Sequence, residues 1–176
     1  PRLKRARAAV AFAAGATVPY RGQPHRITVT GRIRGQVEFT ESRGMPALAV
    51  PGAPEHRARR LRDWLKAQVE RELKRAVARH AARLGVTVKA MSLRDQSTRW
   101  GSCSSTGRLS FNWRLILAPP FVLDYVAAHE VAHLVQMNHS EAFWETVRST
   151  CPRMEAGRGW LRAHGGELMA YGREEG

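Results

Sequence analysis

The sequence predicts an α+β fold: a small antiparallel β region and a long helix, packed with a second group of strands and helices. Three observations indicate this fold. Short strand-like segments alternate with glycine turns in residues 1–52, a long segment after residue 53 has helical periodicity, and two further strand-like segments precede a second helix. With 176 residues, the chain is long enough to bury its own hydrophobic core.

The amino-terminal part of the chain, residues 1–52, is expected to form an antiparallel β meander. Its strand-like segments are rich in β-branched or aromatic residues and are separated by glycines such as Gly22, Gly31 and Gly44, which favour turns. The expected strands are 17–20, 26–30, 36–40 and 47–50.

The rest of the chain, residues 53–176, is expected to form a second domain that begins with an amphipathic helix. Apolar residues recur every three or four positions as far as Leu84, with Pro54 near the start and Gly85 just after the end. Strands are expected near residues 86–91 and 108–117. Pro119 and Pro120 should then start a helix over residues 121–137.

The composition bears on partners and on compartment. The formal net charge is +14, and Arg rather than Lys supplies most of the 29 basic residues, which are spread along the whole chain. Such a charge would suit nucleic acid as a partner, but it also fits a general bias of composition. Two isolated cysteines do not form a disulfide framework and no apolar run is long enough to cross a membrane, so a cytoplasmic location is expected.

The helix expected at residues 121–137 carries the pattern His-Glu-Val-Ala-His from His129 to His133. Two histidines four residues apart lie on one face of a helix, so both imidazoles can reach one zinc ion. Glu130 can then act as general base on a zinc-activated water that attacks a peptide carbonyl. The pattern therefore predicts a zinc-dependent metallopeptidase with one Zn²⁺ and a polypeptide substrate.

A catalytic zinc ion normally has three protein ligands, and His139 is the first candidate for the third. The helix must end before His139 for its side chain to turn back toward the first two histidines. Asn138 favours such an end, and Ser140 is a good N-cap for a following helix. The alternative is a carboxylate from a later helix, for which the candidates are Glu141, Glu145, Glu155 and Glu167.

Four segments together resemble one family of proteins. Residues 92–103, 109–116, 129–133 and 138–144 resemble the YgjP-like metallopeptidases, which are related to the SprT and WLM proteases. The resemblance implies a minimal zincin-like metallopeptidase core in residues 53–176, with His129, His133 and His139 as metal ligands and Glu130 as general base.

The resemblance also suggests which parts of the chain meet the substrate. It implies that the strand around residues 109–115 is the edge strand along which an extended peptide aligns. Arg99 and Asn112 belong to the same pattern and are candidates for substrate or oxyanion contacts, although Arg99 could equally form a structural ion pair or cap.

Two other functions remain open at this point. The chain could be a zinc-stabilised module that binds nucleic acid or protein with little turnover, or a SprT-like protease that acts on protein bound to DNA. Glu130 favours hydrolysis, because a structural zinc site usually fills its fourth position with a protein ligand instead of leaving room for water beside a base.

Overall fold

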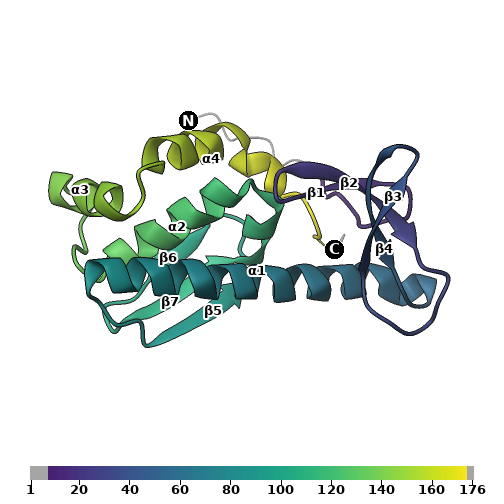
Figure 1. Cartoon of the computed structure of the whole chain (residues 1–176), viewed down its shortest axis with the longest axis horizontal. Helices are drawn as coiled ribbons and strands as arrows, with labels where there is room; N and C mark the ends of the chain where they lie inside the picture. Colours follow the sequence, from purple (N-terminus) through teal and green to yellow (C-terminus); the bar gives the residue numbers. More distant parts are fainter. Residues whose placement is uncertain (1–7, 174–176) are drawn as a thin grey trace.

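A computed structural model describes residues 8–173 and contains two small mixed sheets and four α-helices (Figure 1). The first sheet is formed by β1 (Thr17–Tyr20), β2 (Gln23–Val29), β3 (Glu38–Ser42) and β4 (Met45–Val50), in the order β1-β2-β4-β3. The α+β fold class predicted from the sequence is thus confirmed, and four strands lie close to the expected segments.

The expected antiparallel meander is wrong for one pair of strands, because β2 and β4 are parallel, with Arg26 opposite Ala47 and Val29 opposite Val50. Burial explains the difference. The last four residues of β4 are buried, whereas β3 is almost wholly exposed. The most apolar strand therefore takes a central position, and the polar β3, which is joined to β4 by the tight turn at Gly44, becomes an edge.

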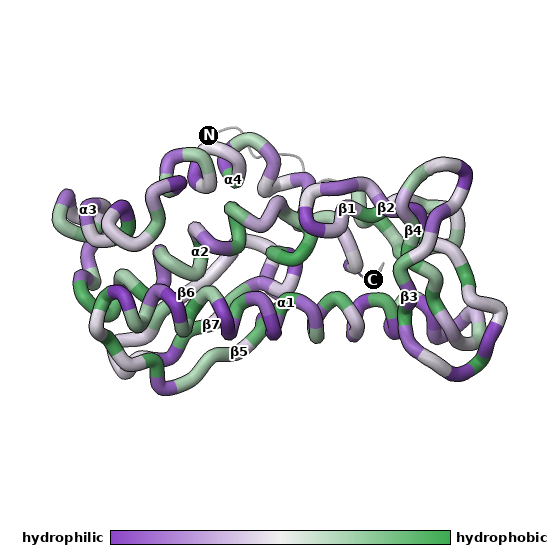
Figure 2. The backbone as a smooth tube through the Cα atoms, viewed as in Figure 1, coloured by the Kyte–Doolittle hydropathy of each residue, from purple (hydrophilic) through white to green (hydrophobic). Residues whose placement is uncertain are grey.

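Helix α1 (Pro54–Leu84) has the predicted bounds, and Gly85 ends it in the left-handed conformation (φ 67°) that glycine adopts without strain. In Figure 1 the helix runs from the first sheet along the second sheet and α2. Figure 2 shows polar and apolar residues alternating along it, as expected for an amphipathic helix. Its buried side chains join a hydrophobic core that both sheets and all four helices share.

The second sheet is formed by β5 (Ala90–Arg94), β6 (Gly101–Cys103) and β7 (Arg108–Asn112), in the order β5-β7-β6. Three expectations are corrected here. The strand expected near residues 86–91 begins later, β6 had not been expected, and the strand expected over residues 108–117 ends at Asn112. It ends there because the Asn112 side chain accepts a hydrogen bond from the Arg114 amide and caps a 3₁₀ helix, η1 (Trp113–Leu117).

Strand β7 is consequently the central strand of this sheet and not its edge, contrary to what the resemblance implied for residues 109–115. It pairs with β5 on one side and with β6 on the other. The edge that faces helix α2 is β6, a strand of only three residues. No strand among residues 8–173 pairs with the outer side of β6, so its backbone groups can pair with a further strand.

Three helices follow: α2 (Pro120–Ala132), α3 (Glu141–Thr150) and α4 (Met154–Leu168). Helix α2 ends five residues earlier than the expected Met137. The amides of Leu134 and Val135 bond to carbonyls three residues back, which tightens the chain into a turn. Within the described residues, none of the helices combines the length and apolar character needed to cross a membrane.

Candidate active site

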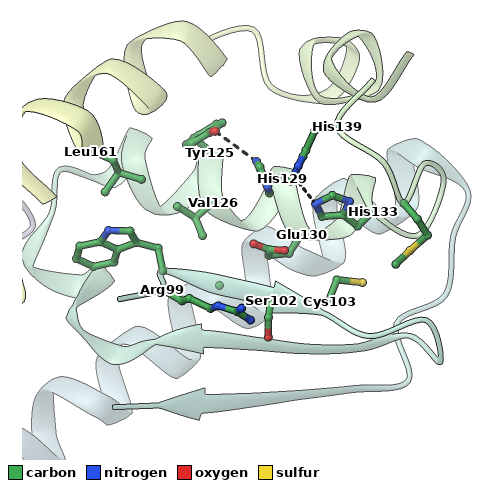
Figure 3. A pocket seen from close by; sticks show the side chains of 13 residues that line it. Arg99, Ser102, Cys103, Tyr125, Val126, His129, Glu130, His133, His139 and Leu161 are labelled. Atoms are coloured by element: carbon green, nitrogen blue, oxygen red, sulfur yellow. Dashed lines mark hydrogen bonds between the residues drawn. The ribbon is translucent and has the colours of Figure 1, made fainter. Parts of the chain in front are cut away.

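Helix α2 and the turn after it bring three imidazole rings together (Figure 3). His129 and His133 lie one turn apart on the same face of α2, and the early end of the helix lets the chain return with His139. One potential ligand atom from each of these side chains lies within 4.8 Å of the other two. The three histidines that the sequence had suggested are thus adjacent in the structure.

Nitrogen atoms of the three rings lie close together, and His129 and His133 each have a protein partner on Nδ1. The Nδ1–H of His133 donates to the Gln136 carbonyl (3.1 Å), so its Nε2 is unprotonated. That Nε2 lies 3.1 Å from Nε2 of His139, and Nδ1 of His129 lies 3.3 Å from the Tyr125 hydroxyl. Two ligand nitrogens on a tetrahedral zinc ion are about 3.3 Å apart. The spacing of the nitrogens therefore fits a metal ion. The Nδ1 atoms of His129 and His133 are bound by Tyr125 and the Gln136 carbonyl, which orients the two rings.

Burial favours the neutral form of His129 and His133, the form in which an imidazole binds a metal ion. It lowers the pKa of His129 to about 4, with further lowering from His133, His139 and Arg158. The pKa of His133 is also lowered by burial, partly offset by its hydrogen bond to the Gln136 carbonyl. Both side chains can consequently bind a cation at neutral pH without first losing a proton.

Aromatic side chains of α3 support the two histidines nearest the turn. Ser140 caps α3 by accepting a hydrogen bond from the Phe143 amide, as the sequence predicted. The helix then places buried Phe143 in a stack on His133, with ring centroids 4.4 Å apart, and Trp144 in a stack on the exposed His139 at 5.9 Å. The third imidazole, although on a turn, is thereby restricted in orientation.

Glu130 points away from Tyr125 and toward strand β6, as Figure 3 shows. Its side chain is 5% exposed, and burial raises the pKa of the carboxyl to about 7. The close approach depends on Gly101, because a Cβ at that position would lie 2.7 Å from Oε2 of Glu130. A carboxyl with such a pKa can both accept and donate a proton near neutral pH.

A cavity of about 470 Å³ lies between β6 and α2 and contains the three histidines and Glu130. This volume is within the range of ligand-binding sites in proteins. The other side chains and backbone that line it come from β6 and the residues before it, from α2, from the turn after α2 and from α4: Arg99, Trp100, Gly101, Ser102, Cys103, Tyr125, Val126, Met137 and Leu161.

Of the two further residues suggested by the sequence, only Arg99 lines this cavity. Its side chain is exposed at the edge. Asn112 is buried outside the cavity, where its Nδ2 donates to the carbonyls of Gln96 (2.6 Å) and Arg99 (3.2 Å). Asn112 thus holds the segment that leads into β6. The carboxylates considered as alternative third ligands are all exposed: Glu141, Glu145, Glu155 and Glu167. Among the described residues, the only group whose ligand atoms are close enough to share a metal ion is the three histidines.

Three residues around the site, Tyr125, Gly101 and Trp144, belong to no motif that assigns them a role. The position of Tyr125, four residues before His129, gave the strongest available signal, because residues four apart share a helix face. Gly101 lies against Glu130, and the ring of Trp144 stacks on that of His139. Both contacts join different elements of the fold. No local pattern reveals such contacts.

Comparison with known proteins agrees with this geometry. A family model described as the YgjP-like metallopeptidase domain matches residues 2–164. The chain belongs to the YgjP-like metallopeptidase family. Its resemblance to that family, drawn from four sequence segments, is therefore confirmed over most of the chain.

One solved structure resembles this YgjP-like domain, the metallopeptidase zymogen of Pyrococcus abyssi abylysin. The two are 21% identical, with a TM-score of 0.42, and the match covers 53% of this chain and 93% of that one. No curated protein matches the chain significantly.

Proposed function

We propose that this chain is a zinc-dependent metallopeptidase in which His129, His133 and His139 hold the metal and Glu130 is the general base. The observation that carries the proposal is the convergence of three imidazoles beside the buried carboxyl group of Glu130 in one cavity. Zinc bound there would supply a Lewis acid that activates water and polarises the peptide carbonyl.

The chain's own residues supply the remaining chemistry. Glu130 faces the cavity next to the histidines, where it can take a proton from the attacking water and deliver it to the departing amine. The free edge of β6 can pair with the main chain of an extended peptide and align one peptide bond with Glu130. The substrate would thus be an unfolded or flexible polypeptide segment.

A zinc-stabilised binding module is less well supported. A structural zinc site is usually closed by four protein ligands, whereas the described residues supply three histidines. A module without turnover also gives no reason for a carboxylate buried at the edge of an open cavity, where desolvation disfavours its charged form.

The test compares the zinc-loaded wild type with Glu130→Gln, which keeps the shape of the side chain but not its basicity. Zinc content is measured by mass spectrometry, and cleavage of an unfolded protein is followed on the same samples. We expect one zinc per chain in both proteins and a cleavage rate at least about 100-fold lower in the variant. Equal cleavage by both would refute Glu130 as the base, and zinc binding without any cleavage by the wild type would favour the binding module.

A further inference from the structure

The cavity has two chemically different ends. One holds the histidines and Glu130, and the other is lined by the apolar side chains of Trp100, Val126 and Leu161. In the view of Figure 3, Val126 and Leu161 lie on the side of Glu130 that is opposite to His133. These three side chains come from the segment before β6, from α2 and from α4, and are called the apolar subsite below.

We propose that the apolar subsite binds a large apolar side chain of the polypeptide substrate, next to the bond that is cleaved. This inference rests on the proposed peptidase function and adds a substrate preference to it. A peptide paired with the edge of β6 would pass Trp100 and Gly101 directly, so a side chain pointing to α2 would reach Val126 and Leu161.

The walls of the apolar subsite are fixed before any substrate arrives. Val126 is 3% exposed, and Trp100 and Leu161 are half-buried and pack against the hydrophobic core. The indole of Trp100 rests on α4 at Gly165, where a Cβ would lie only 3.2 Å from Nε1. Binding therefore needs little rearrangement of the protein, which favours affinity for a side chain that fits.

The composition of the apolar subsite disfavours charged side chains. A buried charge needs a partner, and none of the three lining residues carries a charged or hydrogen-bonding group other than the indole N–H of Trp100. Arg99, next to Trp100 in the sequence, also lines the cavity, but it is an exposed residue and is not enclosed by the three apolar side chains. Loss of a well-fitted apolar group from a substrate typically costs about 10-fold to 200-fold in specificity.

The experiment compares Leu161→Trp, which would fill the subsite, with Ala163→Trp, which adds the same ring at an exposed position of α4 outside the cavity. Zinc-loaded proteins are given peptides that differ only in one residue: Phe, Leu, Gly or Asp. We expect the wild type and Ala163→Trp to cleave the Phe and Leu peptides at least about 10-fold faster than the Gly and Asp peptides, and Leu161→Trp to lose this preference.

A binding measurement separates this proposal from the proposed function. Fluorescence polarisation with labelled Phe and Gly peptides is performed on zinc-loaded Glu130→Gln, alone and combined with either Trp substitution. The subsite is supported if the Phe peptide binds more tightly than the Gly peptide, and if Leu161→Trp abolishes this difference while Ala163→Trp does not. This result would support the subsite even if the wild type cleaves no peptide. Equal binding of both peptides, a preference for Asp, or a Phe preference that survives Leu161→Trp would overturn it. Leu161→Ala, expected to weaken the preference, serves if Leu161→Trp does not fold.

Discussion

The single buried His80 and the three histidines at and after the end of α2 differ in the partners of their ring nitrogens. His80 of α1 is fully buried, and both of its nitrogens have protein partners: Nε2 donates to Asp124 (2.8 Å), and Nδ1 lies 2.6 Å from the Thr150 hydroxyl. His129 and His133 also each have a protein partner on Nδ1, but the second nitrogen of His133 meets that of His139 instead.

This difference separates a structural histidine from a candidate ligand. The bonds of His80 connect α1 to α2 and α3, so removal of the ring should take one hydrogen bond from Asp124 and one from the Thr150 hydroxyl at a packed interface. The histidines at the end of α2 leave lone pairs for a cation. Comparison of His80→Ala with His139→Ala can therefore test whether His80 contributes to stability and His139 to metal binding.

The largest expected effect is on metal binding by His139→Ala. His139 is exposed, so its loss should leave the fold intact while removing one of the three proposed ligands. We expect zinc affinity, measured by competition with a chromogenic chelator, to fall more than about 100-fold. Circular dichroism should be unchanged. Unaltered zinc affinity would show that the third ligand lies elsewhere.

The reverse pattern is expected for His80→Ala. The variant removes a fully buried ring together with its hydrogen bonds to Asp124 and Thr150, which should lower the free energy of unfolding by about 3 kcal/mol in urea titrations. Zinc stoichiometry of the folded protein should stay at the wild-type value. A variant that loses zinc but not stability would reverse the roles assigned to the two groups.

A smaller effect is expected when Glu130 is displaced and the three proposed metal ligands are left in place. In Gly101→Ala the added Cβ would lie 2.7 Å from Oε2 of Glu130, so the carboxylate must move. Misplacement of a catalytic group by about 1 Å can lower kcat/KM about 100-fold. The control is Gly159→Ala, since no atom lies within 4 Å of a Cβ there. Full activity in Gly101→Ala would argue against a positioned base.

The smallest effect concerns acid stability. Burial raises the pKa of Asp124, but hydrogen bonds from His80 and Arg79 lower it more, so that it falls from 3.8 to about 2. A carboxyl with a lowered pKa stabilises the fold above its ordinary pKa and loses this contribution as the pH falls toward the folded value. The stability difference between wild type and Asp124→Asn should therefore shrink between pH 4 and pH 2. A difference independent of pH in urea titrations would contradict this.

Helix bounds and caps were predicted from the sequence more accurately than the pairing of strands. The bounds of α1 follow from Pro54 and Gly85, and the N-cap at Ser140 from side-chain chemistry, because these signals act within a few residues. The grouping of His129 and His133 follows from the geometry of one helix. Each of these predictions depends on local interactions alone.

The failed predictions involve contacts between distant segments. The parallel pairing of β2 with β4 depends on which strand the core buries, and β6 is a strand only because it pairs with β7. The early end of α2 is stabilised by His133, which turns its side chain to the Gln136 carbonyl. Tertiary contacts of this kind override local propensity.

The most direct test of the central claim is anomalous X-ray diffraction at the zinc edge from crystals of the zinc-loaded protein. The account predicts one strong peak about 2.0–2.1 Å from nitrogens of His129, His133 and His139, with Glu130 outside the coordination sphere. A peak elsewhere would contradict the metal site. A peak among the three histidines with Glu130 or Cys103 as a fourth protein ligand would contradict the assignment of Glu130 as base and indicate a closed, structural zinc site.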